Sequence, residues 1–238
     1  MIFRVFDLET TGLPDQDKTT AVIQIGWTDL DFDEAGGAVR SIGDPVQFLV
    51  NPMRANPTLR IETGAKATHH IIEEDLADAV SVDEGFRRLA GGSDAFACHN
   101  REHDGHYFTG AGRPIICTLK AAKVIWLDAE RHSNQFLRYH LDLPVDRHLA
   151  TPAHEAGPDS YVTAHILAAI LATGATLSDL ITWSTSASLM AKIPFGKHRG
   201  TRFEELPTDY LQWLRRQPGN DRDLRHTIQH HLDMRGAL

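Results

Sequence analysis

The sequence predicts an α/β fold, in which a sheet of mixed strand direction is flanked by helices and is followed by a small C-terminal α+β module. Three observations predict it: strand-like runs come early and close together, strands and helical periodicity alternate further on, and the composition changes after residue 184. With 238 residues, 42% of them hydrophobic, the chain can form one sizeable core and a smaller second unit.

The strand candidates are runs rich in β-branched or aromatic residues and bounded by Gly, Pro, Asp or Asn. Turn signals at 11–14 and 34–37 separate the early ones, which predicts an antiparallel meander at the N-terminal edge of the sheet. The candidates are residues 2–9, 21–31, 46–50 and 95–99.

Helical periodicity marks the segments between and after the later strands. Strands that are followed by an alternation of strands and helices are typical of a sheet of mixed direction. The predicted helices cover residues 68–79, 82–89, 118–126, 135–141, 158–172 and 177–183.

A small polar stretch at 184–188 marks the predicted domain boundary. Residues 1–188 carry 15 Lys and Arg against 26 Asp and Glu, whereas residues 189–238 carry 9 against 6. We therefore expect a larger domain over residues 1–184 and a small basic module over residues 189–238.

The module begins with a basic turn, Gly-Lys-His-Arg-Gly, at 196–200. This turn is either a solvated hairpin tip or a loop that contacts phosphate. A helix with Thr208 as its N-cap follows, and we expect it to bury Leu211, Trp213 and Leu214. A last helix over 221–234 completes the expected core of the module.

Composition excludes several classes of protein. Two cysteines, Cys98 and Cys117, have neither the spacing of a zinc site nor the density of a disulfide scaffold, so we expect buried, reduced thiols. No apolar run approaches membrane-spanning length, and the expected location is cytoplasmic, with no membrane partner. The net charge of −8 argues against attraction to nucleic acid over the whole surface.

Two acids, Asp7 and Glu9, lie at the end of the first strand. Residues i and i+2 of a strand project from the same face, so the two carboxylates point together while Phe6 and Leu8 face the other way. Such a pair is repulsive unless a cation lies between its members. The alternative is a solvated strand end that leads into a turn.

Further acids follow other elements. Asp104 comes at the start of an expected helix that leaves the strand 95–99, and Asp159 opens the apolar helix after Pro158, with His154 on the entering loop. Taken singly, these residues have ordinary alternatives: a helix N-cap, a first-turn acid and a surface loop residue.

The order of these residues resembles the DEDDh family of 3′-to-5′ exonucleases over residues 2 to about 174. Asp7 and Glu9 match its first motif, Asp104 its second, and His154 with Asp159 its third. The resemblance implies a ribonuclease H-like fold. It also implies that the four acids bind metal, with Glu9 bridging the ions, and that His154 is the general base.

The chemistry of the residues agrees with this resemblance. Four carboxylates without a Cys or His ligand cluster form a hard oxygen site that suits Mg²⁺ or Mn²⁺. Two such ions about 4 Å apart can hold the attacking and the leaving oxygen at phosphorus. An imidazole, with an ordinary pKa of about 6.5, can take a proton from water near neutral pH.

The resemblance further implies a set of residues that hold the terminal nucleotide. They surround the first and second motifs and comprise Thr10, Thr11, Leu13, His99 and Asn100.

Two positions depart from the family pattern. His103 stands where an aromatic residue usually precedes the second-motif Asp, and Gly157 and Pro158 follow Ala156, where a large apolar residue is usual. These changes affect the surroundings of Asp104 and the start of the last catalytic helix.

The sequence therefore predicts a metal-dependent exodeoxyribonuclease that releases nucleoside 5′-monophosphates from single-stranded or frayed DNA 3′ ends. Two alternatives remain. One is an exonuclease that trims RNA, because the carboxylates do not distinguish deoxyribose from ribose, and the other is a nucleic-acid-binding protein without catalysis. The oligomeric state is left open.

Overall fold

The computed structural model describes residues 1–14 and 19–236. Its centre is a mixed sheet with the strand order β3-β2-β1-β5-β6, in which β4 also pairs with β2. β1 pairs antiparallel with β2 and parallel with β5, and β5 pairs parallel with β6. The strands are β1 (Ile2–Thr10), β2 (Val22–Asp33), β3 (Ala38–Ile42), β4 (Val46–Leu49), β5 (Ala95–Cys98) and β6 (Ile115–Cys117).

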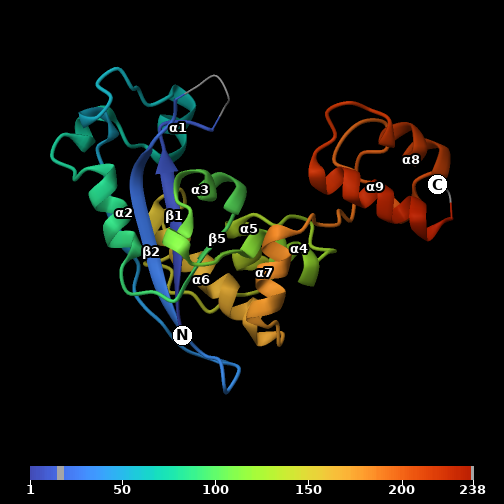
Figure 1. Cartoon of the computed structure of the whole chain (residues 1–238), viewed down its shortest axis with the longest axis horizontal. Helices are drawn as coiled ribbons and strands as arrows, with labels where there is room; N and C mark the ends of the chain where they lie inside the picture. Colours follow the sequence, from blue (N-terminus) through green and yellow to red (C-terminus); the bar gives the residue numbers. More distant parts are fainter. Residues whose placement is uncertain (15–18, 237–238) are drawn as a thin grey trace.

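Helices cover both faces of this sheet (Figure 1). α6 packs across β1 and β2 on one face, and α2 packs against β2 on the other. The helices are α1 (Thr63–His69), α2 (Val82–Ala90), α3 (Arg101–Tyr107), α4 (Thr118–Ile125), α5 (Asn134–His140), α6 (Ala156–Ala172), α7 (Leu177–Thr185), α8 (Thr208–Arg215) and α9 (Arg222–Met234). Short 3-10 helices are η1 (Pro52–Arg54), η2 (Glu73–Leu76), η3 (Gly110–Gly112) and η4 (Phe203–Glu205).

β1 alternates between two hydrophobic clusters. Val5 packs into the cluster on the α6 face, whereas Phe6 and Leu8 pack into the cluster on the α2 face. Because side chains alternate along a strand, Asp7 and Glu9 follow Val5 onto the α6 face at the carboxyl end of β1.

The N-terminus of α6 lies directly against β2. A Cβ atom added at Gly26 would meet the carbonyl carbon of Ala156 at 2.2 Å, so only glycine permits this approach. Two glutamines of the sheet fix the helix start: the Gln24 side-chain oxygen accepts from Ala156 N at 2.9 Å, and that of Gln47 accepts from Gly157 N at 2.9 Å.

The C-terminal segment has a hydrophobic cluster of its own and projects from the rest of the chain in Figure 1. Ion pairs lie at its junction with the larger part, between Lys123 and Asp223 (3.4 Å) and between Arg202 and Asp128 (2.6 Å). The separate cluster supports the division that we propose at residue 189, although residues 237 and 238 lie outside the described residues. The buried cluster residues are Ile193, Phe203, Leu206, Leu211, Leu214, Leu224, Ile228 and Leu232.

The structure confirms the mixed α/β fold and corrects some of its details. The expected antiparallel pairing of the early strands is present at one edge of the sheet, and β1 is its inner strand, which pairs with β5 on its other side. The helix expected over 68–79 is broken: α1 ends at His69, His70 adopts the left-handed region at φ 61°, and η2 follows. β3 and β6 were not predicted, since β3 buries no residue and β6 has only three.

The starts of two helices also differ from the sequence prediction. α6 begins at Ala156, two residues before Pro158. Pro207 rather than Thr208 occupies the N-cap of α8. Trp213 is 48% exposed although burial was expected, because a helix this short buries one face, and Leu211 and Leu214 occupy it.

Within the described residues, no single helix is both long and apolar enough to cross a membrane; α6 and α7 meet that test only as a pair bent by 118°.

The close approach at Gly26 gives the first testable prediction. Gly26→Ala should lower the free energy of unfolding by about 1–3 kcal/mol or more, because the methyl group forces α6 away from β2. Thermal or urea unfolding followed by circular dichroism measures this. Gly64→Ala in α1 is the matched control, since its added methyl group meets nothing within 4 Å. Equal stability of the two variants would contradict the packing described here.

Candidate active site

Acids from two ends of the chain meet at the carboxyl end of β1. Asp7 and Glu9 come from β1, and Asp159 comes from the first turn of α6. One carboxylate oxygen from each of the three lies within 4.8 Å of the others, an arrangement that can hold a metal ion. The structure therefore brings together residues that are separated by 150 positions in the sequence.

Asp104 is the fourth acid of this cluster. It lies in the first turn of α3, which begins at Arg101, so the acid stands near the helix start as the sequence suggested, while Asn100 occupies the N-cap. Its side chain is buried, and its charge raises the pKa of both Asp7 and Glu9. Asp104 is thus close enough to act on the other acids, although it lies outside the group of three oxygens described above.

Burial raises the pKa of every acid in the cluster, and repulsion from neighbouring carboxylates adds to this rise for Asp7 and Glu9. Burial is the largest cause for Asp7, whose pKa lies well above its usual range, and the charges of Asp104, Glu9 and Asp159 add to it. The pKa of Glu9 rises to about 8, and burial raises the pKa of Asp104 to about 7. These shifts mark an excess of negative charge for which a divalent cation is the fitting counter-ion.

Asp159 is held by donors on both of its oxygens. Gln135 donates to Oδ1 at 2.9 Å, and the backbone N–H of His154 donates to Oδ2 at 2.8 Å. Asn134 donates to the Asp159 carbonyl at 3.0 Å. The donors on both oxygens fix the orientation of the carboxylate. Burial raises the pKa of Asp159, and the bonds from Gln135 and His154 lower it. The sequence did not reveal the part of Gln135, because nothing in its local pattern points to Asp159.

His154 lies on the loop that enters α6, as the sequence indicated. Its residue is exposed, and its backbone adopts the left-handed region at φ 63°. The backbone bond to Asp159 keeps this loop beside the acids, and within the described residues the imidazole forms no hydrogen bond or ion pair. The expected arrangement of loop histidine and helix acid is therefore present.

A cavity of about 390 Å³ opens beside Glu9. Thr10 and Leu13 line it, and Leu13 is 74% exposed, so its apolar side chain is available to a ligand. The cavity has the size of a small-molecule site, and of the four acids Glu9 lies in its wall. The other lining residues are Gly12, Glu62, Gly64, Ala65, Thr68, His69 and His103.

Thr11 does not line this cavity. Its side chain is buried, and its hydroxyl accepts from Ala21 N at 3.0 Å. The Thr10 hydroxyl donates to the Gly12 carbonyl at 2.8 Å. Both threonines thus shape the turn after β1, and any contact of Thr11 with a nucleotide would come from its backbone.

His99 and Asn100 have separate positions. The two ring nitrogens of His99 contact Thr118 Oγ1 at 2.9 Å and the His132 carbonyl at 2.7 Å, and burial lowers the pKa of His99 to about 4. Asn100 is exposed at the N-cap of α3. Neither residue lines the cavity beside Glu9.

The segment 62–69 and His103 are the part of the cavity wall that the site prediction missed. Ile71 N donates to His69 Nδ1 at 3.0 Å, so Nε2 carries the proton and donates to the Thr10 carbonyl at 3.2 Å. His69 thereby ties α1 to the end of β1. His103 packs edge-on against Tyr107 at 5.7 Å and takes the place of the usual aromatic residue.

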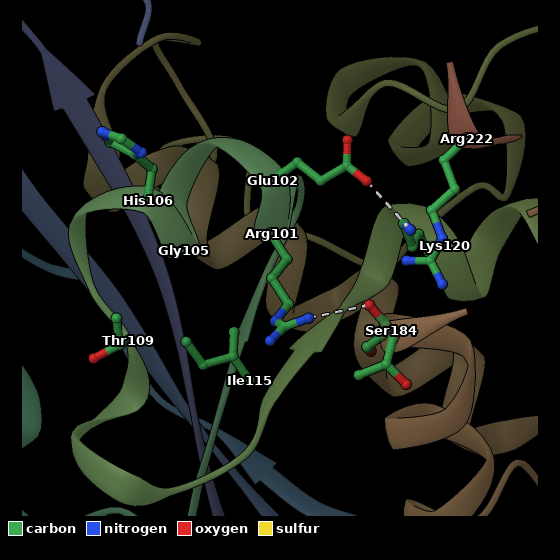
Figure 2. Close-up of a pocket in the computed structure, with 10 residues that line it drawn as sticks. Arg101, Glu102, Gly105, His106, Thr109, Ile115, Lys120, Ser184 and Arg222 are labelled. Atoms are coloured by element: carbon green, nitrogen blue, oxygen red, sulfur yellow. Dashed lines mark hydrogen bonds and ion pairs between the residues drawn. The ribbon is translucent and has the colours of Figure 1, made fainter. Parts of the chain in front are cut away.

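A second cavity, of about 440 Å³, has basic residues in its wall and lies along another face of α3 (Figure 2). Arg101 and Lys120 donate to the carbonyls of Ser184 and Ser186 near the end of α7, and Lys120 pairs with Glu102 at 3.3 Å. These charges therefore help to fix the end of a helix. None of the four acids lines this cavity.

The comparison with family models now defines the class of protein. Residues 5–167 match the family described as Exonuclease (RNase T), and the four acids and His154 lie within this range. The chain belongs to this exonuclease family and is an exonuclease. Residues 186–233 match a second family, described as "Putative quorum-sensing-regulated virulence factor".

Among solved structures, the chain is similar to Exonuclease X in complex with 5′-overhanging duplex DNA. The two share 26% identity with a TM-score of 0.62, over 76% of this chain and 99% of that chain. Cell-death related nuclease 4 (18% identity, TM-score 0.53, 73% of this chain and 64% of that chain) shares the fold. The nuclease domain of 3′hExo, a DEDDh family member bound to rAMP, shares the fold as well (11% identity, TM-score 0.52, 73% of this chain and 92% of that chain). No curated protein sequence matches the chain.

The raised pKa values predict how stability depends on pH without metal. In the unfolded chain these carboxyls have ordinary pKa values near 4, so between about pH 4.5 and 8 the folded state binds more protons. Their contribution to stability is thus complete at low pH and is lost as the pH rises through 7 and 8. In EDTA, the unfolding temperature should fall from pH 5.5 to 8.5, and Mn²⁺ should restore it most at the upper end.

Glu9→Gln should flatten this decline, because the amide cannot ionise. Glu130→Gln is the matched control, since that carboxylate is 76% exposed and pairs with the neighbouring Arg131. Differential scanning calorimetry over the pH series measures all three proteins. An unfolding temperature that rises with pH in EDTA would contradict the assigned burial of the acids.

Proposed function

We propose that this exonuclease removes nucleoside 5′-monophosphates stepwise from the 3′ end of DNA, in a reaction that depends on two divalent metal ions and on His154 as the general base. The convergence of Asp7, Glu9 and Asp159 within 4.8 Å, beside a cavity that is large enough for a nucleotide, carries the proposal. Phosphate would lie at the acidic edge, and the terminal base would contact Leu13.

The donor set supports Mg²⁺ or Mn²⁺. Four carboxylates offer hard oxygen ligands, and their raised pKa values reflect a shortage of positive charge. The exonuclease fold implies dependence on a divalent metal. Two bound ions would activate water and neutralise the charge on the phosphate. Asp7, Glu9, Asp104 and Asp159 would hold these ions.

His154 is the proposed base because of its place in the loop. Its backbone holds Asp159, so the imidazole stays at the edge of the acid cluster, and its exposure lets it exchange protons with solvent. An imidazole can accept the proton of an attacking water. Gln135 would keep Asp159 oriented during this step.

DNA is the proposed substrate because Exonuclease X, which is matched over 99% of its length, was solved with duplex DNA that bears a 5′ overhang. The RNA alternative rests on relatives of lower identity, such as the nuclease domain that binds rAMP. Contacts with backbone phosphates should dominate binding, with little reading of the bases. Single-stranded or frayed 3′ ends fit a site whose cavity holds one terminal nucleotide.

A comparison of DNA with RNA tests the substrate. A single-stranded DNA with a 5′ fluorescent label and the RNA of the same sequence are incubated with the full chain at equal Mg²⁺ concentration. DNA should shorten from its 3′ end and release 5′-monophosphates, as gel electrophoresis and mass spectrometry show. Faster trimming of RNA would overturn the substrate assignment.

Asp7→Asn is the control for this experiment. It should lower the rate by orders of magnitude through the loss of a metal ligand, without loss of stability, because it relieves carboxylate repulsion. EDTA should stop cleavage by the parent protein. Residual activity of the variant above a few per cent would contradict the metal assignment.

His154→Ala tests the base separately. The rate should fall about 100-fold or more, the usual effect of losing a general base, while Mn²⁺ binding by calorimetry stays within twofold of the parent. His148→Ala is the matched control, because His148 is another exposed histidine in the segment before α6. If His154→Ala and His148→Ala are equally active, another group serves as the base.

A further inference from the structure

The C-terminal module carries an aromatic and basic surface that the proposed reaction does not use. We define this aromatic–basic surface as Phe195, Lys197, Arg199, Tyr210 and Trp213. The first three lie in the turn 194–200 and the last two on α8, in the part of the chain that projects from the exonuclease domain (Figure 1).

The turn is anchored at its base. Ile193 is fully buried, its N–H donates to the Thr201 carbonyl at 3.0 Å, and its carbonyl accepts from Gly200 N at 2.8 Å. Gly196 and Gly200 adopt φ angles of 70° and 85°, which favour glycine, so the chain can reverse sharply at both places. The basic residues are thus presented from a short, closed turn.

Aromatic rings continue from this turn onto α8. His198 packs against Tyr210 with ring centroids 4.4 Å apart, and Tyr210 stacks on Trp213 at 5.5 Å and 29°. Tyr210 and Trp213 are three residues apart and therefore share one helix face. This face is an ordered row of rings and not a set of scattered side chains.

The outer rings are not needed by the hydrophobic core. Trp213 is 48% exposed and Phe195 is 42% exposed, and neither belongs to the cluster that holds the module together. Both rings are therefore partly open to solvent, and nucleic-acid bases stack on exposed aromatic rings in many proteins.

The two cations of the turn have no partner among the residues that the structure describes. Lys197 and Arg199 are exposed, and within the described residues neither side chain has an ion pair or a hydrogen bond. Arg202, which follows closely, is instead paired with Asp128 and Glu204. Residues 192–217 carry six basic against three acidic residues, so the surface complements an anionic ligand.

We propose that the aromatic–basic surface binds single-stranded nucleic acid, with bases stacked on Trp213 and Phe195 and phosphates paired with Lys197 and Arg199. A single strand offers unstacked bases and phosphates together, whereas a duplex hides the faces of its bases. The inference rests on the proposed function in one respect: the strand is the one that the exonuclease domain shortens. The module would then hold substrate strands near the acid cluster.

Binding is measured without cleavage, on the full chain with Asp7→Asn in EDTA. An unlabelled 20-nucleotide oligo(dT) should quench tryptophan fluorescence. Trp213→Leu keeps apolar bulk but removes the flat ring, so it should abolish most of the quenching and weaken binding about tenfold. Tyr139→Leu is the matched control, because Tyr139 is an exposed aromatic residue of the exonuclease domain, and it should bind like the parent.

The charge contribution is measured by salt dependence. Lys197→Gln with Arg199→Gln should lower the slope of log K against log salt by about 1.4, since each single-strand phosphate contact contributes about 0.7. Arg40→Gln with Arg87→Gln removes two exposed charges elsewhere and should leave the slope unchanged. A blunt duplex should cause little quenching; quenching equal to that by oligo(dT) would overturn the stacking proposal.

Cleavage by chains with intact Asp7 separates this surface from the active site. Trp213→Leu should raise KM for a 20-nucleotide substrate about tenfold with kcat unchanged, and it should not affect cleavage of a dinucleotide, which fills only the catalytic cavity. Binding that is unchanged in both the Trp213 and the Lys197/Arg199 variants would overturn this inference and leave the proposed function intact. A parent chain that binds oligo(dT) but releases no monophosphate would overturn the proposed function alone.

Discussion

The rest of the structure depends on one constraint, which is that four carboxylates that repel one another are held together in a buried place. Asp7, Glu9, Asp104 and Asp159 reach the carboxyl end of β1 from three segments, and their pKa values all rise. Flexible supports would let such groups move apart. Here a central strand and two helices carry them, so the packing energy of the domain offsets the repulsion between the carboxylates. The resulting negative potential favours the binding of cations.

The docking of α6 against β2 positions one of these four acids. Gly26 has no side chain, so the backbone of the helix can lie directly against the backbone of β2. The side chains of Gln24 and Gln47 accept hydrogen bonds from the first N–H groups of the helix. Asp159 then lies in the first turn, where the positive end of the helix dipole stabilises its negative charge. The same helix fills the hydrophobic cluster on one face of the sheet, so packing of the core also places Asp159 in the acid cluster.

Charge is divided between the two parts of the chain. The acidic excess lies in residues 1–188, whereas residues 189–238 are net basic. An exonuclease with an acidic domain must attract a polyanion to a negative site. Metal ions would neutralise negative charge only at the acid cluster, and not over the rest of the domain. Lys197 and Arg199 have no ion pair in the part of the chain that the structure describes, and their turn packs on Tyr210, the ring that stacks on Trp213. They place attraction and stacking on a module with its own core. The chemical step and the capture of the strand can therefore be tuned separately.

The sequence alone determined the strand–helix order and the acid pattern, because the two-residue period of a strand puts Asp7 and Glu9 on one face and an apolar helix follows Asp159. Tertiary structure decided which surfaces meet. It placed β1 in the middle of the sheet, brought Gln135 to Asp159, and left Trp213 at the surface while its neighbours were buried. Local periodicity tells which face of an element a residue occupies, but the partner of that face depends on contacts between distant segments, which no local pattern contains.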